Sequence, residues 1–377
     1  MSISFLRLSI ISRILLQSHQ IDAFASRQPN SQKICFSQRR MAASLTSSWE
    51  PGTEILSLDS SVLSTSSEDS PQLAKDVDYA EAILKAWTSD ADERTAKQTS
   101  TCSHIEYKCN NKDETSLYGC IYRRSQLTED NESSVPGLIL FHTGAGPQDM
   151  FLRWKADSLV NDKELFPNGC VVLIADIIGD REGWAWSDRT RYDSVRKSIL
   201  IPDENGERNE LKCRVQAAID TLSAQPGVDA GQIAALGFCM GGHPILELAR
   251  MSVPSVKVLV TYHGVFDGVD RLSHVSGIEN KSSNSDDEVT TSKPNVLVCT
   301  GEDDPFVGKQ DLALATAMFN DIGCICRVME FEKTRHGFTN PAQDYNPSDA
   351  FAFNEDSYSK SWSATRDLLK KAFKVNK

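Results

Sequence analysis

The feature that most constrains this chain is a series of short apolar runs, separated by segments with the periodicity of helices. The apolar runs lie at 137–141, 171–175, 233–236, 256–261 and 295–300. The helical segments between them include 150–160, 211–224 and 310–319. Strands that are apolar on both faces are buried on both faces, and helices between them connect parallel strands by right-handed crossovers. The sequence therefore predicts an α/β fold with a mostly parallel central sheet and helices on both faces.

The regions around this alternating core differ in composition. A pair of strand-like segments between 105 and 124 predicts a hairpin, so we expect the main domain to cover 102–377. Before it, 76–101 has apolar positions at helical spacing and is expected to form an N-terminal helical extension, whereas 46–75 is a Ser-rich linker. The polar stretch 273–293 is expected to be a surface loop between two strands.

Residues 1–45 are basic, with six Arg or Lys residues against the single acid Asp22, a net charge of +5. Their apolar stretch is shorter than the ~20 residues needed to span a bilayer. This composition is typical of a targeting presequence. The step from Asp22 to Ala25 resembles the signal and transit junction of algal plastid proteins. We therefore expect an organelle, with the plastid favoured and the mitochondrion as an alternative, or the cytoplasm if translation starts at Met41.

The net charge of the whole chain is −12, so the remainder after the presequence carries −17. Such an acidic body repels phosphate backbones and anionic lipid surfaces, which argues against nucleic acid or a membrane as partner and favours a small organic substrate. The ten cysteines show no CxxC pair or His/Cys metal spacing, and most lie in apolar runs. We expect them to be unpaired buried thiols in a reducing compartment, with no bound metal. The oligomeric state is not specified by the sequence.

The run at 233–236 continues through Gly237, Phe238 and Cys239 directly into a segment of helical spacing. A nucleophile between glycines at a strand-to-helix junction is typical of a nucleophile elbow, here with cysteine in place of serine. Small neighbours are needed because the turn is strained and the strand and helix pack closely. The start of the helix would favour a thiolate on Cys239. The alternative interpretation is a small packing cysteine.

An acid and a histidine follow in the order that α/β-hydrolases use. The strand at 295–300 ends in a carboxylate-rich turn with Glu302, Asp303 and Asp304, and His336 follows the next predicted strand. His336 is a candidate base and Asp304 a candidate orienting acid, although position alone leaves Asp303 and Glu302 open as well.

Three motifs, Gly-Phe-Cys-Met-Gly-Gly at 237–242, Asp-Pro-Phe-Val at 304–307 and His-Gly-Phe at 336–338, resemble the corresponding segments of the dienelactone hydrolase family. The resemblance implies the compact α/β-hydrolase fold and hydrolysis of an ester or lactone through a thioester, without metal or organic cofactor. The resemblance also implies that Asp304, rather than Asp303, is the triad acid. Oxyanion donors are then expected at the backbone of Met240 and in the loop at Thr143.

Substrate contacts are expected from the loop after the second parallel strand, which holds Trp184, Trp186, Arg189 and Arg191. Packing of these tryptophans on surface helices is the alternative.

Two positions depart from the family. Thr143 stands where a glutamate is expected, and Asn340 stands where an arginine would bind a substrate carboxylate, so dienelactone itself is expected to be a poor substrate. The main rival to an enzyme is a catalytically idle scaffold that binds a ligand or protein partner. Redox sensing by Cys239 is a weaker alternative, because no resolving cysteine lies nearby in the sequence.

Overall fold

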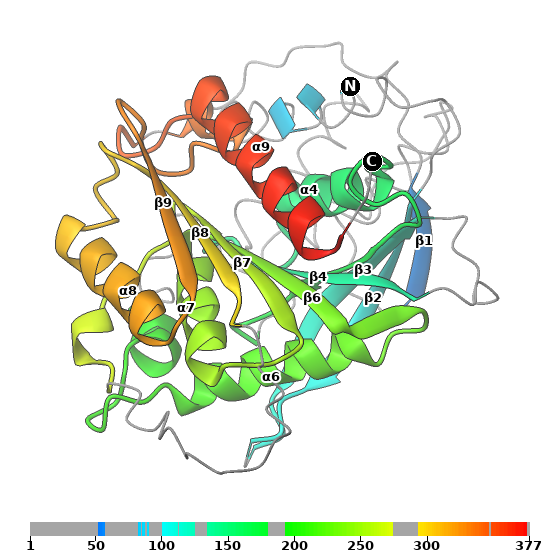
Figure 1. The fold of residues 1–377 in the computed structure, drawn as a ribbon, viewed down its shortest axis with the longest axis horizontal. Helices are drawn as coiled ribbons and strands as arrows, with labels where there is room; N and C mark the ends of the chain where they lie inside the picture. Colours follow the sequence, from blue (N-terminus) through cyan, green and yellow to red (C-terminus); the bar gives the residue numbers. More distant parts are fainter. Residues whose placement is uncertain are drawn as a thin grey trace, which may run out of the picture.

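The computed structural model describes residues 52–56, 82–83, 85–86, 89, 100–111, 113–124, 134–179, 193–273, 293–346 and 348–374. Within them the predicted fold class is confirmed, because helices cover both faces of one mostly parallel sheet (Figure 1).

The described part of the sheet has nine strands in the order β1-β2-β3-β5-β4-β6-β7-β8-β9. The strands are β1 (Gly52–Leu56), β2 (Ser100–Lys108), β3 (Ser116–Arg124), β4 (Val135–Phe141), β5 (Val171–Ala175), β6 (Val228–Phe238), β7 (Val256–Tyr262), β8 (Asn295–Gly301) and β9 (Ile325–Phe331). From β5 to β9 all neighbours are parallel, whereas β1, β2 and β3 form an antiparallel extension that joins β5. The inner parallel strands are mostly apolar because both their faces are covered, whereas the edge strand β9 is largely exposed and carries Arg327 and Glu330.

Two helical layers enclose the sheet. One layer contains α4 (Met150–Asn161) and α9 (Glu355–Ala372), and the other contains α6 (Asn209–Ser223), α7 (Gly242–Met251) and α8 (Lys309–Asp321). Shorter helical turns are η3 (Arg196–Leu200), η4 (Cys239–Gly241), η5 (Val269–Arg271) and η6 (Pro341–Tyr345). Alternate residues of the central strands enter the core beneath each layer, so Leu236 packs toward α4 and Ala235 toward α6 and α7 (Figure 1).

The edges of the chain differ in part from expectation. Gly52–Leu56 pairs with β2 as a strand, although this segment was expected to be linker. The described residues between 82 and 89 are helical, and Ile83 is buried in the core beside α4, as the apolar spacing predicted. Residues 274–292, nearly all of the expected surface loop, lie outside the described residues.

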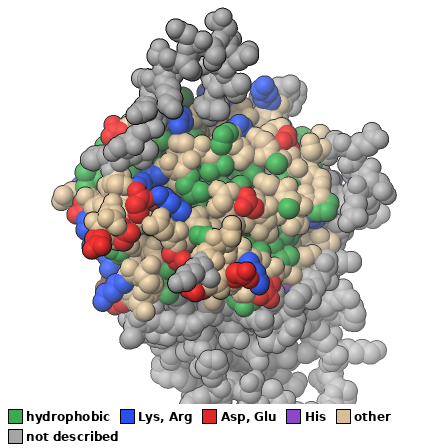
Figure 2. All heavy atoms as spheres, turned by 90° about the horizontal axis from the view of Figure 1, so that it is seen from below, with side chains coloured by type: hydrophobic (Ala, Val, Ile, Leu, Met, Phe, Trp, Pro, Cys, Tyr) green, Lys and Arg blue, Asp and Glu red, His purple; other side chains and the backbone are tan. Residues whose placement is uncertain are grey.

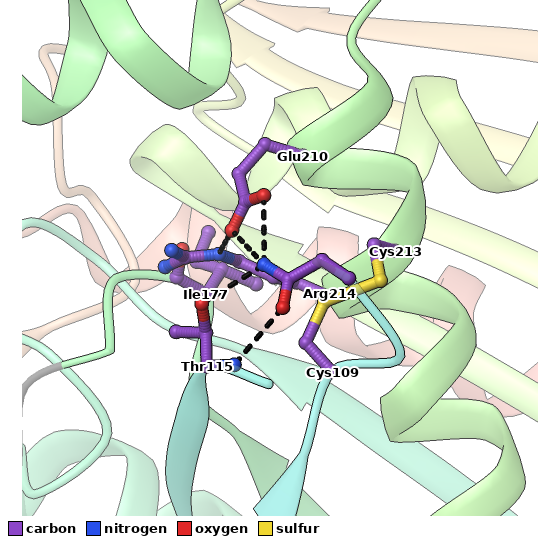
Figure 3. Close-up of a disulfide and its surroundings, with 7 residues drawn as sticks. Cys109, Thr115, Ile177, Glu210, Cys213 and Arg214 are labelled. Atoms are coloured by element: carbon purple, nitrogen blue, oxygen red, sulfur yellow. Dashed lines mark hydrogen bonds and ion pairs between the residues drawn. A yellow bond between two sulfur atoms is a disulfide. The ribbon is translucent and has the colours of Figure 1, made fainter. Parts of the chain in front are cut away.

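The expectation that every cysteine is an unpaired thiol is wrong. Cys109 and Cys213 form a disulfide with their Cα atoms 5.7 Å apart (Figure 3). The pair joins the end of β2 to α6, where Glu210 and Arg214 also form an ion pair at 2.7 Å. These cysteines are separated by 104 residues, so only the folded chain brings them together.

The surface seen from below carries charges of both signs. Acidic and basic side chains lie there in small groups between hydrophobic ones (Figure 2). Among the described helices, none has the length and apolar character that a bilayer crossing requires.

Candidate active site

The carboxyl ends of the parallel strands meet at one edge of the sheet, where ligands bind in open α/β folds. Four candidate residues follow four different strands at this edge. Thr143 comes after β4, Cys239 after β6, Asp304 after β8 and His336 after β9. The sheet therefore gathers residues that are up to about 190 positions apart in the chain.

Cys239 lies in a sharp turn between β6 and α7, and its φ of 55° places it in the left-handed region. This is a strained conformation for a residue with a side chain. A Cβ on Gly237 would approach the carbonyl oxygen of Gly241 to 2.1 Å, and one on Gly241 would lie 2.7 Å from the Phe141 oxygen. The small residues predicted around the nucleophile are thus required by close backbone packing. The Cys239 side chain is partly exposed, unlike most of the other described free cysteines.

Asp304 and His336 are in direct contact. His336 Nδ1 lies 2.8 Å from Asp304 Oδ2, and both side chains are buried. The other carboxylate oxygen of Asp304 accepts a hydrogen bond from the Phe306 backbone at 2.9 Å. In contrast, Glu302 and Asp303 are exposed. Of the three acids that the sequence left open, Asp304 is the one in contact with the imidazole.

The imidazole of His336 also forms a hydrogen bond with Cys239. Because Nδ1 faces Asp304, Nε2 is the nitrogen directed toward the thiol. Burial by itself lowers the pKa of His336, but the charge on the Cys239 sulfur and the hydrogen bonds to Asp304 and Cys239 raise it to about 10. The arrangement therefore favours the imidazolium form of His336.

A second histidine, His263, which no sequence motif pointed to, lies against the site. It follows β7, is 2% exposed, and lies with its ring centre 4.8 Å from that of His336. Its Nδ1 accepts a hydrogen bond from the Cys239 backbone N–H at 3.1 Å. Burial and the positive charge of His336 lower the pKa of His263 well below its ordinary value. A neutral ring with Nδ1 as acceptor carries its proton on Nε2, which then donates to Thr339 Oγ1 at 3.1 Å.

Of the two expected oxyanion positions, one lies in the elbow and the other in the loop after β4. Met240 directly follows Cys239 at the start of the helical turn η4 and is buried. Thr143 lies in the loop after β4, and Phe141 at the end of β4 pairs with Gly237 in the sheet register. The loop at Thr143 thus begins beside the elbow.

The Thr143 side chain is held by a buried acid. Its hydroxyl donates to Asp149 Oδ2 at 3.2 Å, and Asp149 also caps α4 by accepting from the Phe151 backbone. Burial raises the pKa of Asp149 to about 6, although the hydrogen bonds from Phe151 and Thr143 act in the opposite direction. A carboxyl group therefore lies close to Thr143, the position at which the family resemblance implied a glutamate.

The expected substrate contacts and Asn340 are the remaining candidate positions. Trp184, Trp186, Arg189 and Arg191 lie outside the described residues. Asn340 is 3% exposed, and its side chain accepts from the Ala342 backbone at 3.0 Å. Asn340 therefore caps the helical turn η6.

Aromatic side chains surround the imidazole of His336. The rings of Phe306 and Phe351 have their centres 4.9 and 5.3 Å from it in edge-to-face contact. Phe306 is 39% exposed, so it presents an apolar surface to solvent next to the histidine.

Comparison with known proteins identifies relatives of this chain. The model of the dienelactone hydrolase family matches residues 125–373, more than half of the chain. An uncharacterized protein of Caenorhabditis elegans is 26% identical over 174 residues, which cover 46% of this chain and 99% of that protein. A probable 2-oxo-3-(5-oxofuran-2-ylidene)propanoate lactonase of a Bradyrhizobium species is 31% identical over 150 residues, which cover 40% of this chain and 54% of that enzyme. Among solved structures, a dienelactone hydrolase-like promiscuous phosphotriesterase from metagenomic libraries shares the fold, with a TM-score of 0.53, 24% identity, and coverage of 73% of this chain and 99% of that chain.

Proposed function

The chain belongs to the dienelactone hydrolase family, and on this premise we propose that it cleaves an ester or lactone with Cys239 as nucleophile, His336 as acid and base, and Asp304 as orienting acid. The observation that carries the proposal is the chain of contacts from Cys239 through His336 to Asp304. A lactonase among the relatives supports a lactone or ester as substrate class.

The first half-reaction forms a thioester. The Cys239 thiolate attacks the carbonyl carbon, so a carbon–sulfur bond forms and the oxygen becomes an oxyanion. The backbone N–H groups of Met240 and Thr143 stabilise this oxygen. The carbon–oxygen bond to the alcohol then breaks, and the leaving alkoxide takes the proton from Nε2 of His336.

The second half-reaction returns the enzyme to its starting state. The neutral His336 accepts a proton from water, and the resulting hydroxide attacks the thioester. The carbon–sulfur bond breaks, the acid is released, and Cys239 leaves as the thiolate beside the imidazolium. Throughout, Asp304 keeps Nδ1 protonated and stabilises the positive ring. No step calls on a metal or an organic cofactor.

Turnover of a simple aryl ester tests this assignment. Cys239→Ala should lose about 10³-fold or more of kcat/KM, because it removes the nucleophile. Cys326→Ala is the matched control, since Cys326 is another partly exposed free cysteine, located in the edge strand β9. Quenched mass spectrometry of the wild type should find the acyl group on the peptide that contains Cys239. Equal turnover by the wild type and Cys239→Ala would favour the rival of an idle scaffold.

The substrate preference rests on Asn340, which stands where the family resemblance implies an arginine. Its carboxamide is neutral and offers no positive charge to a substrate carboxylate, and its side-chain oxygen accepts from the backbone of η6. A missing charge-assisted contact of about 1.5 to 3 kcal/mol makes dienelactone a poor substrate. Trp184, Trp186, Arg189 and Arg191 remain proposed substrate contacts, and a positive charge from either arginine would compensate for the missing contact. A strong preference in kcat/KM for an anionic lactone over its neutral analogue, lost on mutation of Arg189 or Arg191, would contradict this substrate preference.

For localisation we propose the plastid, supported by the basic composition of residues 1–45. A fusion of residues 1–45 to a fluorescent protein should enter plastids in an algal cell. A fusion that starts at Met41 is the control and should remain in the cytoplasm.

A further inference from the structure

Two sulfur donors and one nitrogen donor come together on strands that carry none of the hydrolytic residues. Cys102 and His104 lie on β2 and Cys120 lies on β3, and β5 and β4 stand between β3 and the elbow strand β6 in the sheet. In the antiparallel register His104 is paired with Cys120, and Cys102 is one step further along β2 on the same face. One donor atom from each residue lies within 4.8 Å of the other two.

The three side chains are held in place by the core between β2, β3 and α4. Cys102 and Cys120 are fully buried and His104 is 7% exposed. Both thiols belong to the apolar cluster that includes Met150 and Phe151 of α4. Two neighbouring strands with this register give a rigid donor set, because each position is fixed by the sheet hydrogen bonds.

The chemistry of the cluster is unusual for an apolar core. The Cys102 thiol is hydrogen-bonded to both Cys120 and His104, so two thiols and one imidazole contact one another where the side chains are buried. The hydroxyl of Tyr122, which is paired with Cys102 across the strands, is buried without a hydrogen-bond acceptor of normal geometry. A buried hydroxyl of this kind costs about 1 to 3 kcal/mol if it remains unsatisfied.

We propose that Cys102, Cys120 and His104 form a three-coordinate site for one soft monovalent cation, Cu⁺. Binding breaks the two S–H bonds, releases two protons, and forms two Cu–S bonds and one Cu–N bond, with no change in oxidation state. Thiolate and imidazole donors select soft ions such as Cu⁺. Two sulfur ligands at about 2.3 Å from one ion in a trigonal plane are about 4 Å apart, which the observed cluster can reach with small movements.

The number of donors favours Cu⁺ over Zn²⁺, because Zn²⁺ would seek a fourth ligand. Arg153 of α4 is 1% exposed, lies 3.9 Å from the Cys120 sulfur and contacts Nε2 of His104 at 3.3 Å. Cu⁺ with two thiolates carries −1, and the neighbouring guanidinium stabilises this negative charge. The thiolate on Cys102 would in addition give the Tyr122 hydroxyl an acceptor.

Titration of the full-length chain with Cu⁺ tests the site. The Cys239→Ala background removes the reactive thiol, ascorbate keeps copper monovalent, and bathocuproine disulfonate serves as competitor. The protein should bind one Cu⁺ per chain at the cluster, and X-ray absorption should find two sulfur atoms and one nitrogen around the metal. Cys102→Ala/Cys120→Ala should lose this ion. Cys170→Ala/Cys324→Ala is the matched control, because it removes two other buried free thiols, and should retain it.

A milder variant keeps the test valid if the double variant does not fold. Arg153→Gln removes the neighbouring charge and should weaken Cu⁺ binding by about 10- to 100-fold, whereas Arg153→Lys should preserve most of it. Equal Cu⁺ binding by the wild type and Cys102→Ala/Cys120→Ala would overturn the site. A Cys102–Cys120 disulfide in the purified protein, found by peptide mass, would overturn it as well. Preferential retention of Zn²⁺ in direct competition would overturn the assignment to a monovalent ion.

Discussion

Replacement of Asp304 by asparagine should move the alkaline limb of the pH–rate profile to lower pH. The variant keeps the shape of the side chain but removes the negative charge that accepts the hydrogen bond from His336 at 2.8 Å. Both groups are buried, so solvent does not screen the loss. In this variant the burial that lowers the pKa of His336 remains. Of the two partners that raise this pKa, Cys239 is kept and the Asp304 carboxylate is lost.

The size of the shift follows from the contact. A hydrogen bond between charged groups contributes about 1.5 to 3 kcal/mol, which corresponds to about 1 to 2 pKa units at 1.36 kcal/mol per unit. In the wild type, His336 has a pKa of about 10, so activity should fall only above that pH. The folded pKa is raised above the ordinary value of 6.5. The stability that the imidazolium contributes is therefore complete below pH 6.5 and is lost as the pH rises through about 10.

The assay is kcat/KM for an aryl ester between pH 5 and 11, since this ratio reports the pKa values of the free enzyme. Asp303→Asn is the matched control, because Asp303 is the adjacent, exposed acid and should leave the limb in place. A shift of the alkaline limb in Asp303→Asn, with no shift in Asp304→Asn, would refute the assignment of the triad acid. Direct titration of His336 by NMR in both variants gives a second readout that does not depend on turnover.

Three further predictions concern the residues around the nucleophile and the disulfide. Iodoacetamide should alkylate Cys239 faster than any other cysteine, which peptide mapping checks. Cys239→Ser should lose most of the activity in a kinetic assay, because the site is built around a larger and more acidic nucleophile than serine. His263→Leu leaves the Cys239 N–H without its acceptor, so the free energy of unfolding in urea should fall by about 1 to 3 kcal/mol and kcat should fall as well. His263→Asn should lose less of both, because asparagine tolerates the positive φ of 42° and supplies an oxygen as acceptor. Cys213→Ser opens a disulfide across 104 residues and should lower the free energy of unfolding by up to about 4.7 kcal/mol, a loss that Cys324→Ser should not reproduce.

The sequence by itself determined the sheet apart from β1, most of its helices and the order of the candidate triad. These features depend on local patterns, because a strand buried on both faces is apolar along its length and a helix repeats its apolar positions every 3.6 residues. The nucleophile elbow was visible for the same reason, since its glycines and cysteine are consecutive and their steric roles are local. The position of the helix around Ile83 also followed from spacing.

Only the tertiary structure decided which of the neighbouring acids meets the histidine. Glu302, Asp303 and Asp304 are equivalent in a carboxylate-rich turn, and burial of Asp304 against His336 separates them. Asp304 and His336 are 32 residues apart, so no local pattern records their contact.

The same limit explains what the sequence missed. The Cys109–Cys213 disulfide, the support of Cys239 by His263 and the donor cluster on β2 and β3 all join residues from different strands or helices. Composition and periodicity describe the environment of one residue along the chain, whereas hydrogen bonds, ion pairs and sulfur contacts depend on distances of a few ångströms in space. Those distances are set by the strand order and register, which place distant segments side by side only after the chain has folded.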